Sequence, residues 1–323
     1  MSKTEPTTLL EAIKHFSDPD VALATMVELR WPSGVHCPGC GRTDVTFIPT
    51  RRVWTCKTRH PKWQFSAKVG TIFEDSPLGL DKWFAAIWMV ANCKNGISSY
   101  EVGRDLGVTQ KSAWFMLHRI RLAMKAGSIL KMTGEVEADE SYLGGKLGNM
   151  SLSKRKTFGK GAVGRGNSGK RAVVGILERK SGKKPSKVKA THVGDVRGVT
   201  LKGLIRDAVE PGTRLLTDSF AAYRGLRGEY LHEVVDHAVT YVQGTVHTNG
   251  IENFWSLLKR TIKGTYVSVE PFHLDRYLDE QSFRFNERTD VDSGRFRSVL
   301  RSVTGRRLTY KELTGHGEAQ APD

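Results

Sequence analysis

The chain has 323 residues, of which 39% are hydrophobic, so it can build one large core or two to three smaller ones. Fifty Lys and Arg against 34 Asp and Glu leave a net charge of +16, an excess that indicates a polyanionic partner, most often nucleic acid. The sequence has no run of about 18 apolar residues and starts without the apolar core of a signal peptide, so we expect an intracellular protein with no membrane helix.

Residues 1–30 predict one or two short helices, because Leu9, Leu10, Ile13 and Phe16 recur at helical spacing. Residues 31–76 are different: they are rich in turns, with short β-like runs and no long apolar segment. Such a piece cannot fold on its apolar core alone, so we expect a metal to hold it together.

Cysteines in this second segment supply the ligands for that metal. Cys37 and Cys40 form a C-x2-C knuckle, Cys56 follows across a predicted β-ribbon, and His60 lies four residues further on. Three thiolates and one imidazole suit tetrahedral Zn²⁺, and four protein ligands make the site structural rather than catalytic. His36 competes for the fourth position, although its place directly before Cys37 makes a shared tetrahedron awkward. Free thiols in a small core are the alternative.

Residues 77–130 predict helices. "LDKWFAAIWMVANCKNG" is an amphipathic helix that ends near Gly96 and carries Cys93 as a core thiol. "SSYEVGRDLGVTQKSAWFMLHRI" predicts a helix, a tight turn at Gly107, and a second helix with Thr109 as its N-cap. The second helix is expected to expose three side chains suited to base edges and phosphates: Gln110, Lys111 and Arg119. An ordinary helical hairpin is the alternative to a DNA-binding helix-turn-helix.

Residues 131–290 predict an α/β domain. Strands are expected in "EVEADESYLGG", "RAVVGILER", "SKVKATHV", "TRLLTDSF" and "LHEVVDHA", and helices in "TLKGLIRDAV", "GIENFWSLLKRTIK" and "HLDRYLDEQSFRFNER". Between the first two strands, residues 144–170 are rich in Gly, Lys and Arg and predict a mobile basic loop that includes Lys154, Arg155 and Lys156. Residues 291–323 are expected to form a C-terminal tail.

Three acids of the α/β segment stand at positions suited to catalysis. Asp139 lies on a strand, Asp218 closes an apolar strand, and Glu252 lies in the first turn of a helix. Carboxylates arranged in this way can hold two Mg²⁺ or Mn²⁺ ions for phosphoryl transfer, because these hard cations prefer oxygen ligands. Any one of them can equally be a solvated surface acid. Three other acids of the same strand compete with Asp139 for the role of metal ligand: Glu135 and Glu137 on the same face, and Glu140 on the other. Only its position relative to the strand end favours Asp139.

The order of these motifs carries a resemblance. A zinc ribbon, a helix-turn-helix, "EADESYLGGK", "LLTDSFAAY" and "HTNGIENFWSLLKR" follow one another, and the sequence resembles the DDE transposases of bacterial insertion sequences. Within them it is similar to the branch with an N-terminal zinc ribbon and helix-turn-helix, which is also related to eukaryotic Merlin transposases. The match runs from about Trp31 to about Arg288. It implies an RNase H-like catalytic domain, a mixed sheet flanked by helices, behind the ribbon and the helix-turn-helix.

The resemblance also implies roles for single residues. Asp139, Asp218 and Glu252 match the metal-binding acids, and Lys259 matches a lysine that follows the glutamate by two helical turns and faces the DNA backbone. Three neighbours on the same segment are further candidates for DNA contact: His247, Asn249 and Arg260. For His247 and Asn249, helix capping is the alternative.

One departure from the family pattern concerns the ribbon. The family ribbon closes with a second C-x2-C, whereas here Arg59 occupies that position and His60 follows it. The fourth zinc ligand is therefore left open by the resemblance.

The resemblance implies a DNA transposase that binds terminal inverted repeats, cuts the element ends, and joins the 3′-hydroxyls to target DNA. Double-stranded DNA is then the partner, and joining two ends requires a dimer or a higher assembly. We expect such a protein in the cytoplasm, associated with the nucleoid. Two alternatives are a nuclease of the same fold, which cuts without joining, and a zinc-ribbon DNA-binding regulator derived from a transposase.

Overall fold

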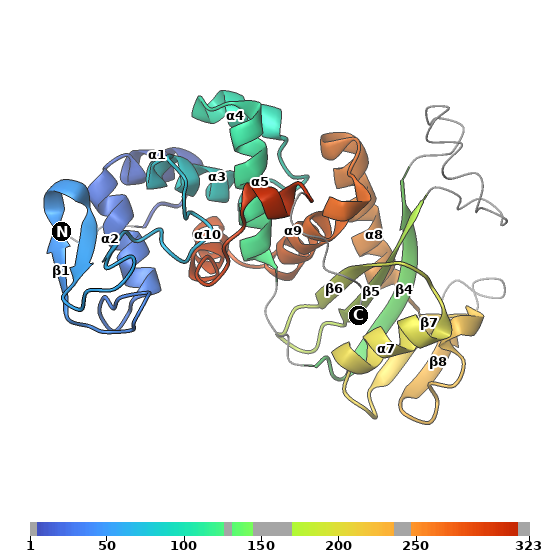
Figure 1. Ribbon diagram of the computed structural model, residues 1–323. Coiled ribbons are helices and arrows are strands. Elements are labelled where there is room, and N and C mark those ends of the chain that lie inside the picture. Colours follow the sequence, from blue (N-terminus) through green and yellow to red (C-terminus); the bar gives the residue numbers. More distant parts are fainter. Residues whose placement is uncertain (1–4, 126–130, 145–169, 236–246, 316–323) are drawn as a thin grey trace. The chain divides into compact units, whose positions relative to one another are not determined.

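The computed structural model describes residues 5–125, 131–144, 170–235 and 247–315. The chain forms two compact units, one of Met1–Lys125 with Asp290–Asp323 and one of Ala126–Thr289 (Figure 1). Together they give the α/β fold class that the sequence predicts, with a small cysteine-containing sheet near the N-terminus and a mixed sheet flanked by helices. Among the described helices, none has the length and apolar character needed to cross a membrane.

The first unit combines helices with a three-stranded antiparallel sheet of order β1-β2-β3. The strands are short, which fits a segment with little apolar content. The elements in chain order are α1 (Leu9–Phe16), α2 (Pro19–Arg30), β1 (Val45–Ile48), η1 (Pro49–Arg51), β2 (Val53–Cys56), β3 (Gln64–Phe65), α3 (Leu80–Asn92), α4 (Ser99–Leu106), α5 (Gln110–Met124), α10 (Asp292–Arg301) and α11 (Tyr310–Leu313).

Helix α3 forms the centre of this unit, and every residue from 83 to 91 is buried. Aromatic rings pack around it: Phe16 lies 4.9 Å from Phe84, and Trp88 lies 5.3 Å from Phe296, between ring centroids. Phe296 belongs to α10, so the segment expected to be a tail is part of the helical core instead. Its sequence gave little sign of this, because α10 buries only a few apolar side chains.

The second unit is built on a five-stranded sheet of order β6-β5-β4-β7-β8. Strands β4, β5 and β6 are antiparallel neighbours, whereas β7 and β8 run parallel to β4. Its elements are β4 (Glu135–Leu143), β5 (Arg171–Glu178), β6 (Lys187–Val193), α7 (Gly198–Ala208), β7 (Arg214–Asp218), η3 (Ala221–Tyr223), β8 (Leu231–Val235), α8 (Asn249–Thr261), η4 (Ile262–Tyr266), η5 (Pro271–His273) and α9 (Leu274–Asn286).

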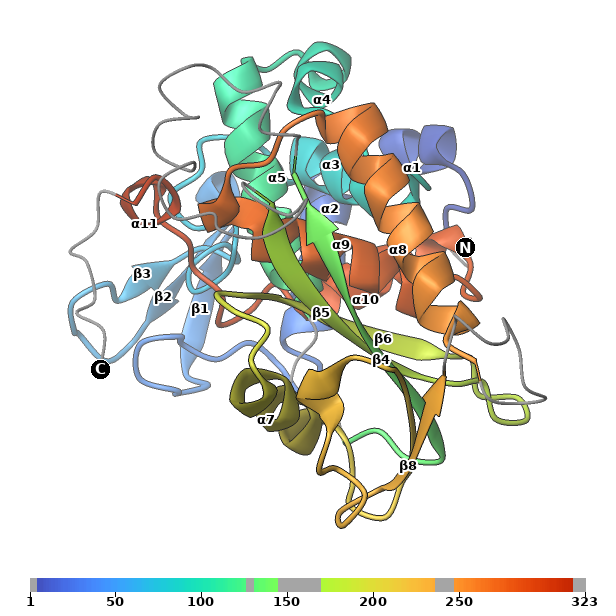
Figure 2. The same ribbon diagram turned by 90° about the vertical axis from the view of Figure 1, so that its right-hand side faces the viewer.

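Helices cover both faces of this sheet (Figure 2). Val136, Ala138 and Leu215 face the cluster that contains α7, and Val173 and Leu177 face the cluster that contains α8 and α9. Since side chains alternate along a strand, the odd-numbered residues of β4 point towards α8. That alternation decides which acids of β4 can meet Glu252.

Candidate functional site

Two aspartates lie side by side on the central strands. In the parallel pairing of β4 with β7, Ala138 stands opposite Thr217, so Asp139 and Asp218 follow at the next position of each strand. Ala138 faces the α7 cluster, and Thr217 stands opposite Ala138 on the same face of the sheet. The next residues, Asp139 and Asp218, therefore lie on the other face, which α8 covers. Strand β7 ends at Asp218, while β4 continues for four residues beyond Asp139 to Leu143.

Helix α8 brings Glu252 and Trp255 to the same face. The indole Nε1 of Trp255 donates to Asp139 Oδ2 at 2.9 Å, one helical turn after Glu252. Thr248 Oγ1 donates to Glu252 Oε1 at 3.0 Å, and the Phe220 N–H donates to Asp218 Oδ1 at 3.0 Å. Each of the three acids thus accepts a hydrogen bond from a neighbouring residue, which fixes one of its carboxylate oxygens.

The electrostatics of Asp139 show that the three carboxylates interact. Burial raises the pKa of Asp139 to about 6; the Trp255 hydrogen bond opposes this rise, and the charges of Asp218 and Glu252 add to it. A carboxylate in this position is destabilised by its like-charged neighbours, and a bound cation would relieve that repulsion.

The rival acids of β4 have other partners. Glu137 is buried and accepts from Arg179 Nε at 2.7 Å, and Glu135 accepts from Arg179 Nη1 at 3.0 Å. Glu140 lies on the opposite face, where Tyr223 donates its hydroxyl to Glu140 Oε2 at 2.7 Å. Burial raises the pKa of Glu140 to about 7; this hydrogen bond lowers it, and the charges of Asp218 and Asp139 raise it further.

The donor set of the acidic trio (Asp139, Asp218 and Glu252) fits a divalent cation of the Mg²⁺ or Mn²⁺ class. All the donors are carboxylate oxygens, and they come from two strands and a helix of one unit.

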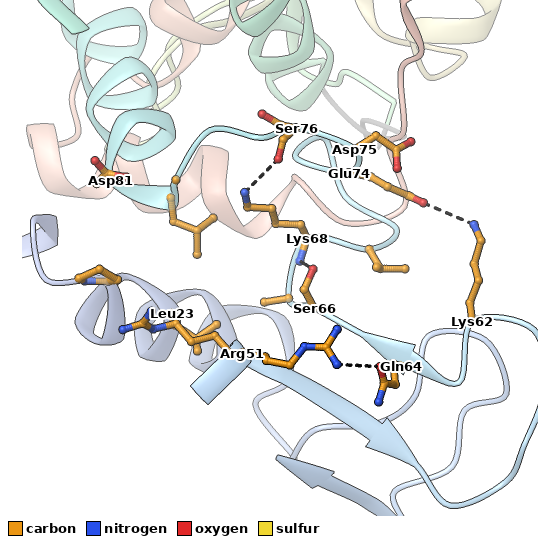
Figure 3. Close-up of a pocket in the computed structure, with 16 residues that line it drawn as sticks. Leu23, Arg51, Lys62, Gln64, Ser66, Lys68, Glu74, Asp75, Ser76 and Asp81 are labelled. Atoms are coloured by element: carbon orange, nitrogen blue, oxygen red, sulfur yellow. Dashed lines mark hydrogen bonds and ion pairs between the residues drawn. The ribbon is translucent and has the colours of Figure 1, made fainter. Parts of the chain in front are cut away.

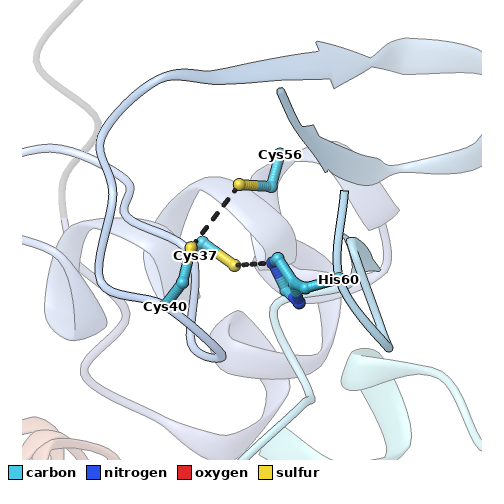
Figure 4. Close-up of side chains that lie close together, drawn as sticks. All are labelled: Cys37, Cys40, Cys56 and His60. Carbon is cyan, nitrogen blue, oxygen red and sulfur yellow. Dashed lines mark hydrogen bonds between the residues drawn. The ribbon is translucent and has the colours of Figure 1, made fainter. Parts of the chain in front are cut away.

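The cysteine cluster of the first unit is closed (Figure 4). One ligand atom from each of Cys37, Cys40, Cys56 and His60 lies within 4.8 Å of all the others. Cys37 Sγ lies 3.3 Å from His60 Nε2, and Cys40 Sγ lies 3.6 Å from Cys56 Sγ. His60 Nδ1 lies 2.7 Å from the Pro61 carbonyl oxygen and donates its proton there, which leaves Nε2 as the lone-pair nitrogen a metal needs.

These contacts favour His60 over the competing histidine as the fourth ligand. His36 instead packs against Trp31, with ring centroids 6.0 Å apart. Gly39 lies in the knuckle, and a Cβ atom there would come within 2.9 Å of His60 Cε1, so the imidazole fits closely over the knuckle. The set of three thiolates and one imidazole fits structural zinc.

Helices α4 and α5 meet at Gly107, whose φ of +59° lies in the left-handed region that favours glycine. Thr109 caps α5 by accepting from the Ser112 N–H at 3.2 Å, as the sequence predicts. At the start of α5, Gln110 and Lys111 are exposed. Gln110 Nε2 donates to Ser99 Oγ at 2.9 Å.

The expectation that α5 exposes Arg119 is wrong. Arg119 is 4% exposed, and its guanidinium donates to the carbonyl oxygens of Leu308, Ile72 and Glu74 at 2.7 to 3.0 Å. It also lies over the Phe115 ring, 4.2 Å from its centroid. Arg119 therefore joins segments of the first unit, and its donors are not available to a phosphate.

The remaining candidates for DNA contact lie near α8. His247 Nδ1 accepts from Arg179 Nη2 at 3.0 Å, so its ring is tied to the sheet, while Asn249 is exposed. Lys259 is half-buried and Arg260 is exposed in the last turn of α8. The basic residues Lys154, Arg155 and Lys156 lie outside the described residues.

A pocket of about 600 Å³ lies in the first unit, between the ribbon, the start of α2 and the segment that leads to α3 (Figure 3). Both of its lysines have protein partners: Lys62 Nζ lies 3.7 Å from Glu74 Oε1, and Lys68 Nζ donates to the Ser76 carbonyl at 3.2 Å. The acidic trio contributes none of its lining, and we assign the pocket no catalytic role.

Comparison with known proteins adds the family. A model described as the ISXO2-like transposase domain matches residues 131–286, and a transposase zinc-ribbon domain matches residues 17–58. A transposase-like protein of Haemophilus influenzae is 33% identical over 101 residues, which cover 31% of this chain and 81% of that protein. The chain belongs to the ISXO2-like transposase family. A protein of the transposable element ISH50 in Halobacterium salinarum is also similar, 28% identical over 278 residues, or 82% of this chain and 90% of that protein.

The family matches confirm the resemblance seen in the sequence and cover the candidate sites unevenly. The ISXO2-like transposase match contains the whole acidic trio and ends at the last residue of α9. The zinc-ribbon match contains Cys37, Cys40 and Cys56 but stops before His60, and α4 and α5 lie between the two matched segments.

Sequence reasoning missed Tyr223 and Arg179, since nothing in the pattern shows that Tyr223 reaches Glu140 or that Arg179 reaches the start of α8.

Proposed function

We propose that the protein is the DNA transposase of an insertion sequence, and that Asp139, Asp218 and Glu252 are its catalytic metal ligands. One observation carries the proposal: two aspartates on adjacent strands share a face with a helix-borne glutamate. Burial, and then the charges of Asp218 and Glu252, raise the pKa of Asp139. Membership of the transposase family supports the same assignment. A divalent cation bound there supplies Lewis-acid stabilisation of the attacking and leaving oxygens.

The neighbouring residues of the chain would orient this site on DNA. Trp255 holds Asp139 through its indole N–H and fixes one oxygen of that carboxylate. Lys259 follows Glu252 by seven residues, about two helical turns, and places a cation on the same side of α8. Asn249 at the start of α8 and Arg260 in its last turn are both exposed and can contact the DNA backbone.

We assign recognition of the element ends to residues 31–76 and 77–130, and chemistry to residues 131–290. Gln110 and Lys111 are exposed at the N-terminus of α5. In a helix-turn-helix, the N-terminal residues of the recognition helix contact base edges. The basic stretch 144–170 adds charge for flanking or target DNA. With several phosphate contacts, affinity should fall by about 10³–10⁵ between 50 and 200 mM salt. Joining two ends calls for a dimer or a higher assembly, associated with the nucleoid in the cytoplasm.

The test is a reaction of the purified protein with DNA that carries the element's own ends, with Mg²⁺ or Mn²⁺ and a target plasmid. Joined products establish transposition. Cleavage without joining would make the protein a nuclease of the same fold. Specific end binding with no cleavage in either metal would make it a regulator derived from a transposase.

A further inference from the structure

Glu137 is a buried acid that the proposed chemistry leaves unused. Its side chain is 1% exposed and lies on the α8 face of β4, two residues before Asp139. Both of its oxygens are occupied: Oε1 accepts from Arg179 Nε at 2.7 Å, and Oε2 accepts from the Ile251 N–H at 2.7 Å. A buried carboxylate that binds a helix backbone from a neighbouring strand fixes where that helix begins.

The Ile251 amide needs such an acceptor. Ile251 is the third residue of α8, and the first amides of a helix have no acceptor within the helix itself. Thr248, the residue at the N-cap position, makes no capping bond with its side chain; its hydroxyl donates to Glu252 instead. Glu137 therefore takes the place of the missing cap, and its charge also suits the positive end of the helix dipole.

Close packing makes this junction specific. Gly250 lies against the Glu137 carboxylate, and a Cβ atom there would come within 2.8 Å of Oε2. Arg179 extends the junction, because its guanidinium also donates to the carbonyl oxygen and Nδ1 of His247. The chain is thus held on both sides of the α8 N-cap, at His247 before it and at Ile251 after it.

We propose that Glu137 is a positioning residue that holds Glu252 in place opposite Asp139, an inference that rests on the proposed catalytic role of the trio. Glu252 directly follows Ile251, and Asp139 lies two residues after Glu137. One hydrogen bond, from the Ile251 N–H to the Glu137 carboxylate, therefore joins the helix and the strand that carry two of the three acids. Without it, the repulsion between the acids favours movement of the first turn of α8 away from the sheet.

The first readout is amide hydrogen exchange in the metal-free acidic site, on the full chain with its zinc retained. Glu137→Gln can satisfy only one of its two donors, since one end of the amide is itself a donor. We expect the Ile251 amide to exchange at least about tenfold faster, while the amides of the later turns of α8 keep their protection. The matched control is Glu135→Gln, which alters a partner of the same Arg179 without touching α8.

The second readout is Mn²⁺ affinity, measured by calorimetry on the same proteins without DNA. We expect Glu137→Gln to weaken Mn²⁺ binding about tenfold, as loss of an outer partner of a metal ligand does, and Glu135→Gln to change it less than about twofold. Because Glu137 acts through Glu252, the double variant with Glu252→Gln should bind no more weakly than Glu252→Gln alone. If Glu137→Gln does not fold, Gly250→Ala disturbs the same junction and should give the same loss.

Unchanged Mn²⁺ affinity and unchanged Ile251 exchange in Glu137→Gln or Gly250→Ala would overturn the inference, as would a full additional loss in the double variant. Failure of the proposed function has a different signature: Glu252→Gln would then bind Mn²⁺ as the unaltered chain does. In that event the exchange of Ile251 alone decides whether Glu137 holds α8.

Discussion

Replacing Asp139 by Asn removes a charge that the folded sheet destabilises, so we expect Asp139→Asn to be more stable than the unaltered chain when no Mg²⁺ is added. The pKa of Asp139 is raised from 3.8 to about 6, first by burial and then by the charges of Asp218 and Glu252. One pH unit corresponds to about 1.4 kcal/mol, so the ionised form costs about 3 kcal/mol of folding free energy at neutral pH. The Asn carbonyl can still accept from Trp255, and we expect a gain of about 2–3 kcal/mol, roughly 4–10 °C in melting temperature.

The raised pKa of Asp139 determines how the stability difference between the variant and the unaltered chain changes with pH. A carboxyl with a raised pKa stabilises the fold fully below its unfolded value and loses that contribution as the pH rises through the folded value. The advantage of Asp139→Asn should therefore be small below about pH 4, grow between about pH 4 and 6, and be greatest above about pH 7. Thermal unfolding followed by circular dichroism tests this, with zinc retained and Asp207→Asn, an exposed acid of α7, as the control. A gain that is absent at neutral pH, or equal at every pH, would refute the reasoning. Added Mg²⁺ should stabilise the unaltered chain more than the variant.

Three further outcomes follow from the geometry. Gly175→Ala would place a Cβ 2.7 Å from side chains of α8, so we expect a loss of about 1–3 kcal/mol in chemical unfolding, while Gly203→Ala, with open space around it, should lose nothing. His60→Ala should lower bound zinc below half of one equivalent by elemental analysis, whereas His36→Ala should retain it; the reverse result would reassign the fourth ligand. Lys111→Ala should weaken binding of element ends and lower the slope of log affinity against log salt by about one if it contacts a phosphate, and an unchanged slope would rule that contact out.

The α/β pattern of the sequence predicts the strands and helices of the second unit well, because each segment has a clear period or a buried apolar run. It also places Asp218 at a strand end, where the structure has it. The local pattern does not single out Asp139 among the acids of its strand, because β4 continues beyond it and only the register with β7 sets it beside Asp218. Register is a long-range property that the local pattern does not contain.

Buried charges account for most of what the sequence did not reveal. Arg119 has the spacing of an exposed helix residue, yet three carbonyl oxygens from distant segments bind it in the interior. Glu137 likewise reads as one acid of a charged strand, and only the position of α8 shows that it binds the Ile251 amide. The sequence does not indicate α10 for a related reason: its few buried residues contact a core formed about 200 residues earlier in the chain.

The most direct test of the central claim compares the unaltered chain with Glu252→Gln on supercoiled plasmid, with and without Mg²⁺ or Mn²⁺, while DNA binding is measured in parallel. If the acidic trio is the catalytic metal site, nicking requires the metal and is lost in Glu252→Gln, at least about a hundredfold, although DNA binding is kept. Nicking by Glu252→Gln at the rate of the unaltered chain would contradict the account, because cleavage would then come from residues outside the trio.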